Sequence, residues 1–311
     1  MLHRILRMKY EKLSCCQKVW NQIFNDSPNS SPFVSFEWFD CLSRFLVHTD
    51  PDVMLFYDQK ICVGIIPVQI KDSTVRFITD ERVTDLTGFV CVRGYEDDII
   101  RELVSFIRRE RLHADLSPLD HANPLVQRSA DFLHNVTLEK ADVNPLLELP
   151  ASWDDYLAIL TAKLRHELRR KLRKGHAIRL ETCKPEAINV LFELMAHDAQ
   201  KRQFLMPDMQ AFFTAIATCF FERGWLRLRI AHIDGKPIAT LLAFSFHKRI
   251  YLYNMGVESS YMYLSPGIVA IGLDIKDAIT EGNKYYDFLR GDEEYKFRFG
   301  ARRQHTMRLR A

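Results

Sequence analysis

Two stretches of the chain share one order of strands and turns, and this repetition limits the possible folds more than any other feature. Residues 58–66 align without gaps on residues 234–242, an offset of 176 positions. Each stretch lies within short β-branched and aromatic runs separated by polar turns, a pattern typical of antiparallel strands. A helix and a further strand are expected after each series, so we interpret the two stretches as an internal duplication.

The length and composition fit two globular domains. The chain has 311 residues, 47% of them hydrophobic, which is enough for two domains of ordinary size. Residues 134–149 are expected to be extended, and the prolines at 145 and 150 favour a boundary there. We therefore expect an α/β (α+β) protein with domains at 1–150 and 151–311.

Local patterns place the elements within each half. In the first half we expect mostly helix over 11–48 with Ser35 as a cap, strands at 53–57, 61–70, 74–79 and 113–116, and a helix over 96–111. In the second half we expect helices at 153–174, 185–203 and 208–223, and strands at 177–183, 225–233, 237–246, 249–257 and 285–289.

Composition excludes several classes of protein. No apolar run reaches the roughly 20 residues of a membrane helix, and the first residues lack the apolar core of a signal peptide, so we expect a cytoplasmic protein. The seven cysteines contain no C-x-x-C pair, which favours reduced thiols, and acyl chemistry on cysteine is a remote alternative. The eleven histidines lack ligand spacing, and we expect no metal site.

Charge is distributed unevenly between the halves. Residues 1–150 carry 17 Lys/Arg against 22 Asp/Glu, whereas residues 151–311 carry 26 against 18. An anionic ligand is therefore expected in the second half. Ser265, a natural N-cap, and Pro266, which suits the first helical position, predict that a helix begins there. The free amides of its first turn would face the tip of the preceding strand, a geometry that binds phosphate.

The densest group of reactive side chains follows the strand at 285–289. After a turn at Arg290 and Gly291, residues 292–296 supply three carboxylates, a tyrosine and a lysine. Open α/β sheets usually bind ligands beside strand ends, so we expect the chemistry of the protein at this turn.

Four motifs together resemble one known family. They are Trp153-x-x-Tyr156, the basic helix at 163–174, Ser265-Pro-Gly, and residues 287–296. The combination resembles BioF2-like, polysaccharide-biosynthesis-associated acetyltransferases of the GNAT superfamily, which are related to Fem-type peptidyltransferases. The resemblance is clear from 150 to 300 and weak before 145. It implies two tandem GNAT-like domains, each a mixed, mostly antiparallel sheet flanked by helices, with a degenerate first copy.

The resemblance also implies an activity and a co-substrate. Such enzymes transfer an acyl group, commonly acetyl from acetyl-CoA or another acyl-CoA, to an amine on a sugar or cell-envelope precursor. By this resemblance the pyrophosphate contacts the helix start, and the pantetheine lies between strands 249–257 and 285–289. The cofactor-binding residues are then Ser265, Gly267, Ile268 and Arg290. The usual Gln/Arg-x-x-Gly-x-Gly/Ala signature is absent from 259–267.

Acyl transfer to an amine requires a base, an oxyanion donor and a group to neutralise the departing thiolate. Asp292, Glu293 or Glu294 are candidates for the base, Tyr253 or Tyr251 for the leaving group, and a backbone amide for the oxyanion. Lys296 matches the lysine of the Fem-type Phe-Lys-x-x-Phe-Gly element, with Tyr295 in place of the first Phe, and is expected to hold a substrate phosphate or carboxylate.

Structural roles compete with these functional ones. Asp292 and Glu293 could only cap the turn and pair with Arg290 or Arg298, and the two tyrosines could be core aromatics. Asp287 is a further catalytic candidate, for which a site acid and a buried structural acid are equally compatible with the strand pattern.

The sequence is compatible with several roles for the basic helix at 163–174 and with more than one overall function. The helix could present a solvated face, or contact coenzyme phosphates, an anionic lipid-linked sugar or RNA. Two other functions stay open accordingly: a transferase that uses aminoacyl-tRNA, as Fem-type relatives do, and a non-catalytic scaffold that binds an anionic partner.

Overall fold

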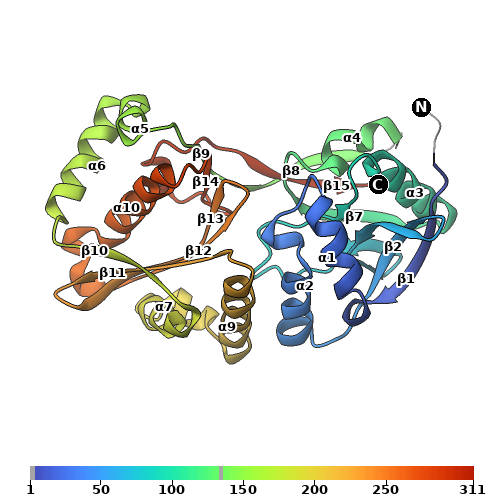
Figure 1. Ribbon diagram of the computed structural model, residues 1–311, viewed down its shortest axis with the longest axis horizontal. Helices are drawn as coiled ribbons and strands as arrows, with labels where there is room; N and C mark the ends of the chain where they lie inside the picture. The colour runs from blue at the N-terminus through green and yellow to red at the C-terminus, as the bar shows by residue number, and fades with distance from the viewer. Residues whose placement is uncertain (1–3, 133–135) are drawn as a thin grey trace. The chain divides into compact units, whose positions relative to one another are not determined.

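The computed structural model describes residues 4–132 and 136–311, which form two compact units (Figure 1). Unit 1 comprises the chain up to Asp142 together with His305–Ala311, and unit 2 comprises Val143–Gln304. The chain returns to unit 1 for its last strand, which a single boundary at residue 150 does not describe. Within the described residues, no helix combines the length and apolar character needed to cross a bilayer.

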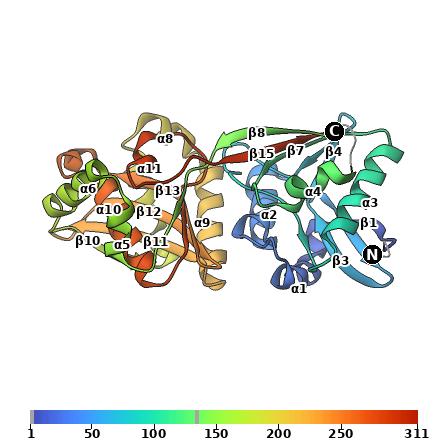
Figure 2. The same ribbon diagram turned by 90° about the horizontal axis from the view of Figure 1, so that it is seen from above.

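Unit 1 contains two sheets. The first has the order β1 (Arg7–Lys12), β2 (Asp52–Asp58), β3 (Ile61–Ile66), β6 (Val90–Cys91). The second has the order β4 (Val68–Lys71), β5 (Thr74–Phe77), β7 (His113–Leu119), β15 (His305–Arg310), β8 (Thr137–Val143), and Figure 2 shows β15 between β7 and β8. The longer helices are α1 (Gln17–Asp26), α2 (Phe36–Leu42), α3 (Glu96–Arg109) and α4 (Pro124–Phe132).

Unit 2 is built on one six-stranded sheet. Its order is β10 (Arg179–Cys183), β11 (Leu226–Ile233), β12 (Lys236–Phe246), β13 (Arg249–Val257), β14 (Tyr285–Asp287), β9 (Leu146–Glu148). Its helices are α5 (Trp153–Ile159), α6 (Ala162–Lys174), α7 (Ile188–Met195), α8 (Ala199–Phe204), α9 (Pro207–Glu222), α10 (Pro266–Thr280) and the short α11 (Glu294–Phe297). Figure 1 shows α6 and α10 on one face of the sheet and α7 and α9 on the other.

The two units repeat one order of connections. In each unit an antiparallel hairpin, β2–β3 or β11–β12, is followed by a pair of parallel strands joined through a helix. The parallel pairs are β5–β7 across α3 and β13–β14 across α10. Asp58 and Asp234 both lie at the hairpin turn, so the residues aligned by sequence occupy equivalent positions. A parallel pair needs such a crossover, which explains why a helix separates its strands in both copies.

Three predicted elements are shorter than their sequence patterns suggested, and a polar side chain marks each break. The helix expected over 153–174 is interrupted before Thr161, whose hydroxyl accepts a hydrogen bond from Leu164 N (3.4 Å) and caps α6. Asp198 similarly divides 185–203, because its carboxylate caps α8. The strand expected over 285–289 ends at Asp287, which accepts a hydrogen bond from Leu289 N. Apolar periodicity continues through these breaks, but local capping stops the element.

The region 11–48 is mostly helical, as predicted, but its helical part is not continuous. It is divided into α1 and α2, and β1 extends to Lys12. Ser35 caps α2 as expected, accepting a hydrogen bond from Trp38 N at 3.2 Å.

Close packing of β13 on α7 yields a test of the fold. A Cβ atom added at Gly256 would lie 2.7 Å from Leu194 Cβ and 2.8 Å from Met195 N, which is backbone and cannot move aside. We expect Gly256→Ala to destabilise unit 2 by about 1–3 kcal/mol, the usual cost of overpacking. Urea unfolding followed by circular dichroism measures this.

Gly272→Ala is the matched control for that substitution. Its added Cβ meets only flexible ends of Leu168 and Leu172, at 3.3 Å, and it lies inside α10 where alanine is the better helix former. The free energy of unfolding of this variant, measured by urea in the same way, should change by about 1 kcal/mol or less. Equal midpoints for Gly256→Ala and the unmodified protein would contradict the packing described here.

Candidate active site

The site lies where β13 and β14 separate. The two strands pair over only three residues each, from Arg249 opposite Tyr285 to Tyr251 opposite Asp287. Beyond that point β14 ends, whereas β13 continues to Val257. A β-bulge against β12 at Tyr253 interrupts the ladder at the same level. The second half of β13 therefore presents one edge that no described strand covers.

A cavity of about 530 Å³ lies beside this edge of β13. Its wall is formed by residues 255–257 of β13, by residues 265–268 at the start of α10, and by side chains from α6, α8, α11 and the link between α7 and α8. The volume is in the range of small-molecule sites in proteins. All of its lining residues belong to unit 2.

The start of α10 contributes backbone rather than a capping side chain. Ser265 occupies the N-cap position with φ 54°, but its side chain makes no capping hydrogen bond, contrary to expectation. A Cβ on Gly267 would lie 3.0 Å from Met255 Sδ, so glycine allows α10 to approach β13 closely. The first-turn amides and the positive end of the helix dipole therefore remain available to an anion in the cavity.

The structure brings together three of the four residues expected at the coenzyme. Ser265, Gly267 and Ile268 all line the cavity. Arg290 does not line it, and its backbone carbonyl instead accepts a hydrogen bond from Lys296 Nζ at 2.7 Å. A coenzyme contact by Arg290 is therefore not supported by its position.

Lys296 has a different environment from the predicted one. Its side chain is 3% exposed, and its ammonium donates to the carbonyl oxygens of Leu289, Arg290 and Gly291 at 2.7–3.3 Å. It also pairs with the Glu293 carboxylate at 2.9 Å. These four acceptors use the donors of the ammonium, so Lys296 holds the turn after β14 rather than a substrate anion in this arrangement.

The three carboxylates of this turn lie on the surface. Asp292 pairs with Arg303 at 2.6 Å, with both side chains about half exposed, and Glu294 pairs with Arg298 at 3.1 Å with its side chain 84% exposed. None of the three lines the cavity, although Glu293 lies close enough for its charge to act on Lys201 and Tyr295, which do. Of these three carboxylates, Glu293 is therefore the one closest to acting on the cavity, whereas Asp198 at the start of α8 lines the cavity directly.

Asp287 and the two tyrosines have structural environments. Asp287 is fully buried and accepts hydrogen bonds from Arg249 (2.5 Å), Asn144 (3.2 Å) and Leu289 N (2.8 Å). Tyr253 packs against Phe213 and Phe244 with ring centroids 5.8 and 5.2 Å away. Tyr251 is buried with the Arg249 guanidinium over its ring. Neither tyrosine lines the cavity, so the structure does not bring Asp287, Tyr251 or Tyr253 to it.

Two residues to which the sequence analysis gave no catalytic role, Lys201 and Tyr295, line the cavity and have shifted pKa values. The Lys201 ammonium donates to Met255 O at 2.6 Å, and burial lowers the pKa of this lysine, opposed by the charges of Asp198 and Glu293. Burial, and then the charge of Glu293, raises the pKa of Tyr295 well above its usual range. No local pattern identified Lys201, because its burial arises from packing of α8 on β13.

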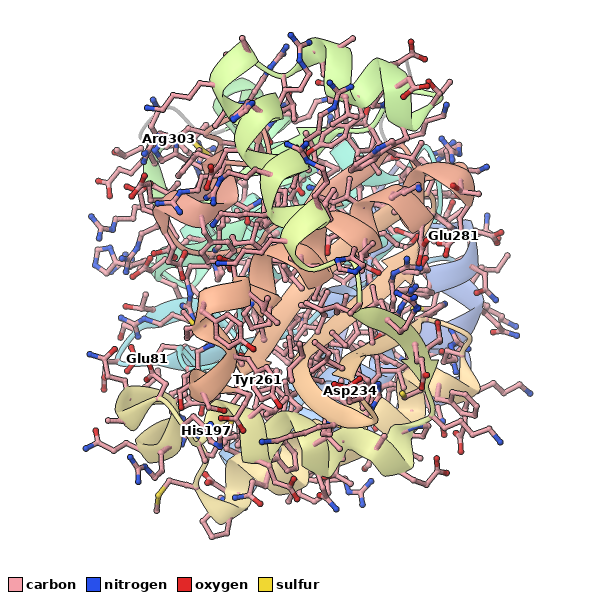
Figure 3. The ribbon with its side chains drawn as sticks, turned by 90° about the vertical axis from the view of Figure 1, so that its left-hand side faces the viewer. Glu81, His197, Asp234, Tyr261, Glu281 and Arg303 are labelled. Carbon is pink, nitrogen blue, oxygen red and sulfur yellow. The ribbon has the colours of Figure 1, made fainter. Side chains whose placement is uncertain are left out.

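His197 also lines the cavity, at the link between α7 and α8. Its Nδ1 lies 3.4 Å from the Glu258 carboxylate and 3.5 Å from Ser259 N, at the start of the 3-10 turn Ser259–Leu264. Figure 3 labels His197 and Tyr261 of that turn, which both appear in the lower part of the view. The described part of the chain contains no group of three or more His, Cys, Asp or Glu side chains arranged to bind a metal ion.

The second unit matches a known family. Residues 162–297, which run from α6 to α11, match the model of the acetyltransferase (GNAT) domain, so the chain carries a GNAT domain. No curated protein sequence gives a significant match.

Solved structures extend the likeness to both units. FemX has a TM-score of 0.68 at 11% identity over 97% of this chain and 96% of its own. A C-terminal domain of a putative lysylphosphatidylglycerol synthetase from Agrobacterium fabrum has a TM-score of 0.60 at 11% identity, covering 96% of this chain and 92% of its own.

A tandem GNAT protein from the clavulanic acid biosynthesis pathway has a TM-score of 0.50 at 11% identity, covering 98% of each chain. At such identities the likeness concerns the fold. The chain is thus a mixed α/β protein of the tandem GNAT type, related in fold to FemX, and the resemblance inferred from its motifs is confirmed at that level.

The buried Asp287 gives a prediction that separates structural from surface acids. We expect Asp287→Ala to destabilise unit 2 by about 3 kcal/mol, because Arg249, Asn144 and the Leu289 amide would all lose the fully buried carboxylate that accepts their hydrogen bonds. Thermal or urea unfolding measures the change. The control is Asp292→Ala, whose exposed pair with Arg303 should contribute less than about 1 kcal/mol. If the two variants lose similar amounts of unfolding free energy, Asp287 does not have the structural role described here.

Proposed function

We propose that the protein is an N-acyltransferase. It moves an acyl group, in the first instance acetyl, from acyl-CoA directly onto an amine of a sugar or cell-envelope precursor. The single observation that carries the proposal is the cavity that lies between the free edge of β13 and the uncapped start of α10. The GNAT domain matched over residues 162–297 contains all of these elements.

The cavity offers groups that fit the two parts of the co-substrate. The amides of Gly267 and Ile268 and the cations Lys171 and Arg298 on the wall suit the pyrophosphate, and they stand in for the missing signature loop. The uncovered edge at Met255–Val257 suits the amide-containing pantetheine arm, which can pair with a strand edge. Gly267 leaves this space free, because a side chain there would meet Met255 and Val257.

The reaction joins the amine nitrogen to the thioester carbonyl carbon and breaks the carbon–sulfur bond. The departing thiolate takes a proton, and the amine loses one. We assign Lys201 as the proton donor to the thiolate, because it lines the cavity beside Met255 and because burial lowers the pKa of its ammonium, which makes the proton easier to release. We assign Glu293 as the acceptor of the amine proton, directly or through water. Tyr295, which stays protonated, supplies a hydroxyl donor in the cavity wall.

Binding of the co-substrate can be tested without knowing the acceptor. Calorimetry should detect binding of acetyl-CoA and coenzyme A, and Gly267→Val should weaken both by about tenfold or more, since the added methyl groups enter the space beside Met255. Gly272→Ala, in the same helix but away from the cavity, should bind like the unmodified protein. Absence of binding to either compound at high concentration would refute the acyl-CoA-dependent function.

The role of Lys201 is tested by two substitutions. Lys201→Met and Lys201→Arg should both lower the transfer rate about 100-fold, because methionine has no proton to give and arginine does not release one, while acetyl-CoA affinity changes little. The assay is thiol release with an acceptor found by mass-spectrometric screening of amino sugars. Lys276→Met, on the exposed side of α10, is the control. Full activity of Lys201→Arg would show that the reaction needs only a positive charge at this position, and Lys201 would not be the proton donor.

A further inference from the structure

A second cavity of unit 2 lies between α5 and α6. Its volume is about 630 Å³, and its wall is rich in arginine. Arg165, Arg169 and Arg173 follow one another at four-residue spacing and therefore lie along one side of α6. Trp153 and Leu157 face them from α5. None of its lining residues is shared with the cavity at α10, so this arginine groove is a separate site.

The charges of the arginine groove are not neutralised within the part of the chain that the structure describes. No carboxylate lines the groove, and none of the described carboxylates lies within ion-pair distance of Arg169 or Arg173. Arg165 is oriented by a hydrogen bond from its Nη1 to Leu157 O at 3.3 Å.

Arg170, the residue after Arg169, is paired with a carboxylate, unlike Arg169 and Arg173. Its guanidinium donates two hydrogen bonds to Glu167, at 2.9 and 3.0 Å, and it does not line the groove. Like charges four residues apart weaken a helix. The row of arginines is therefore unfavourable for α6 by itself, and an anion bound in the groove would remove this repulsion.

We propose that the arginine groove binds a pyrophosphate-bearing ligand with an aromatic ring, of the nucleoside diphosphate class. Guanidinium groups suit phosphate oxygens because they present paired donors in a plane. Trp153 provides an indole for the ring, and the volume suits a small molecule rather than a polymer. The site does not depend on the proposed acyltransferase activity.

The experiment is calorimetry on the full chain with inorganic pyrophosphate, ADP, UDP and adenosine. The two nucleotides and pyrophosphate should bind with dissociation constants below about 1 mM, and adenosine should not bind measurably. Arg169→Gln should weaken ADP binding about tenfold, whereas Arg170→Gln, the same charge change on the same helix, should alter it less than about twofold. Equal effects of the two substitutions, or binding of adenosine as tight as that of ADP, would overturn the proposal.

Two further arms identify the ligand and the site. Trp153→Leu should weaken ADP binding and leave pyrophosphate binding unchanged. If Trp153→Leu instead loses both ligands and has a lower unfolding midpoint, the variant has lost its fold, and Arg169→Gln alone then tests the site. Gly267→Val should leave ADP binding intact; if it abolishes ADP binding, the nucleotide occupies the cavity at α10 and the groove is not its site. Displacement of ADP by tRNA, dependent on Arg169, would show a polymer ligand and overturn the small-molecule assignment.

Discussion

The short parallel pairing of β13 with β14 determines the geometry of unit 2. Only three residues of each strand pair, and the buried Asp287 holds this junction through Arg249 on β13 and Asn144 before β9. The same carboxylate ends β14 by accepting a hydrogen bond from Leu289 N. Because β14 ends there and β13 continues, the free edge beside the cavity is a direct consequence of where this carboxylate lies. The cavity therefore depends on a residue that does not line it.

A second buried carboxylate fixes the helix on the other side of the cavity. Asp274 of α10 is fully buried, and it accepts hydrogen bonds from Tyr286 on β14 and Arg227 on β11, each at 2.9 Å. Burial, and then the charge of Asp274, raises the pKa of Tyr286, so its hydroxyl remains a donor. A buried ion pair of this kind contributes little net stability, but it fixes register. Here it sets the position of α10 along the sheet, and with it the position of Gly267.

Local signals in the sequence predicted the parts of this arrangement that arise locally. Pro266 and Gly267 indicated where α10 begins, and the alternating strands with their Asp234 turn indicated the meander, because both depend on nearby residues. Residue type did not predict where a side chain points. Lys296 was expected to hold a substrate group, yet its ammonium donates to carbonyl oxygens of the turn after β14. Lys201 gave no signal, since its lowered pKa comes from tertiary burial.

The two units differ in the charge at the start of their crossover helices. In unit 1 the crossover helix α3 begins with Glu96, Asp97 and Asp98, and Glu96 accepts a hydrogen bond from Gly94 N at 2.7 Å. The negative charge of these carboxylates offsets the positive end of the α3 dipole and disfavours a phosphate there. In unit 2 the first turn of α10 has no acid and its serine does not cap it. The two units therefore share an order of connections but differ in the electrostatics of the helix start, and only the start of α10 has the charge that the proposed co-substrate requires.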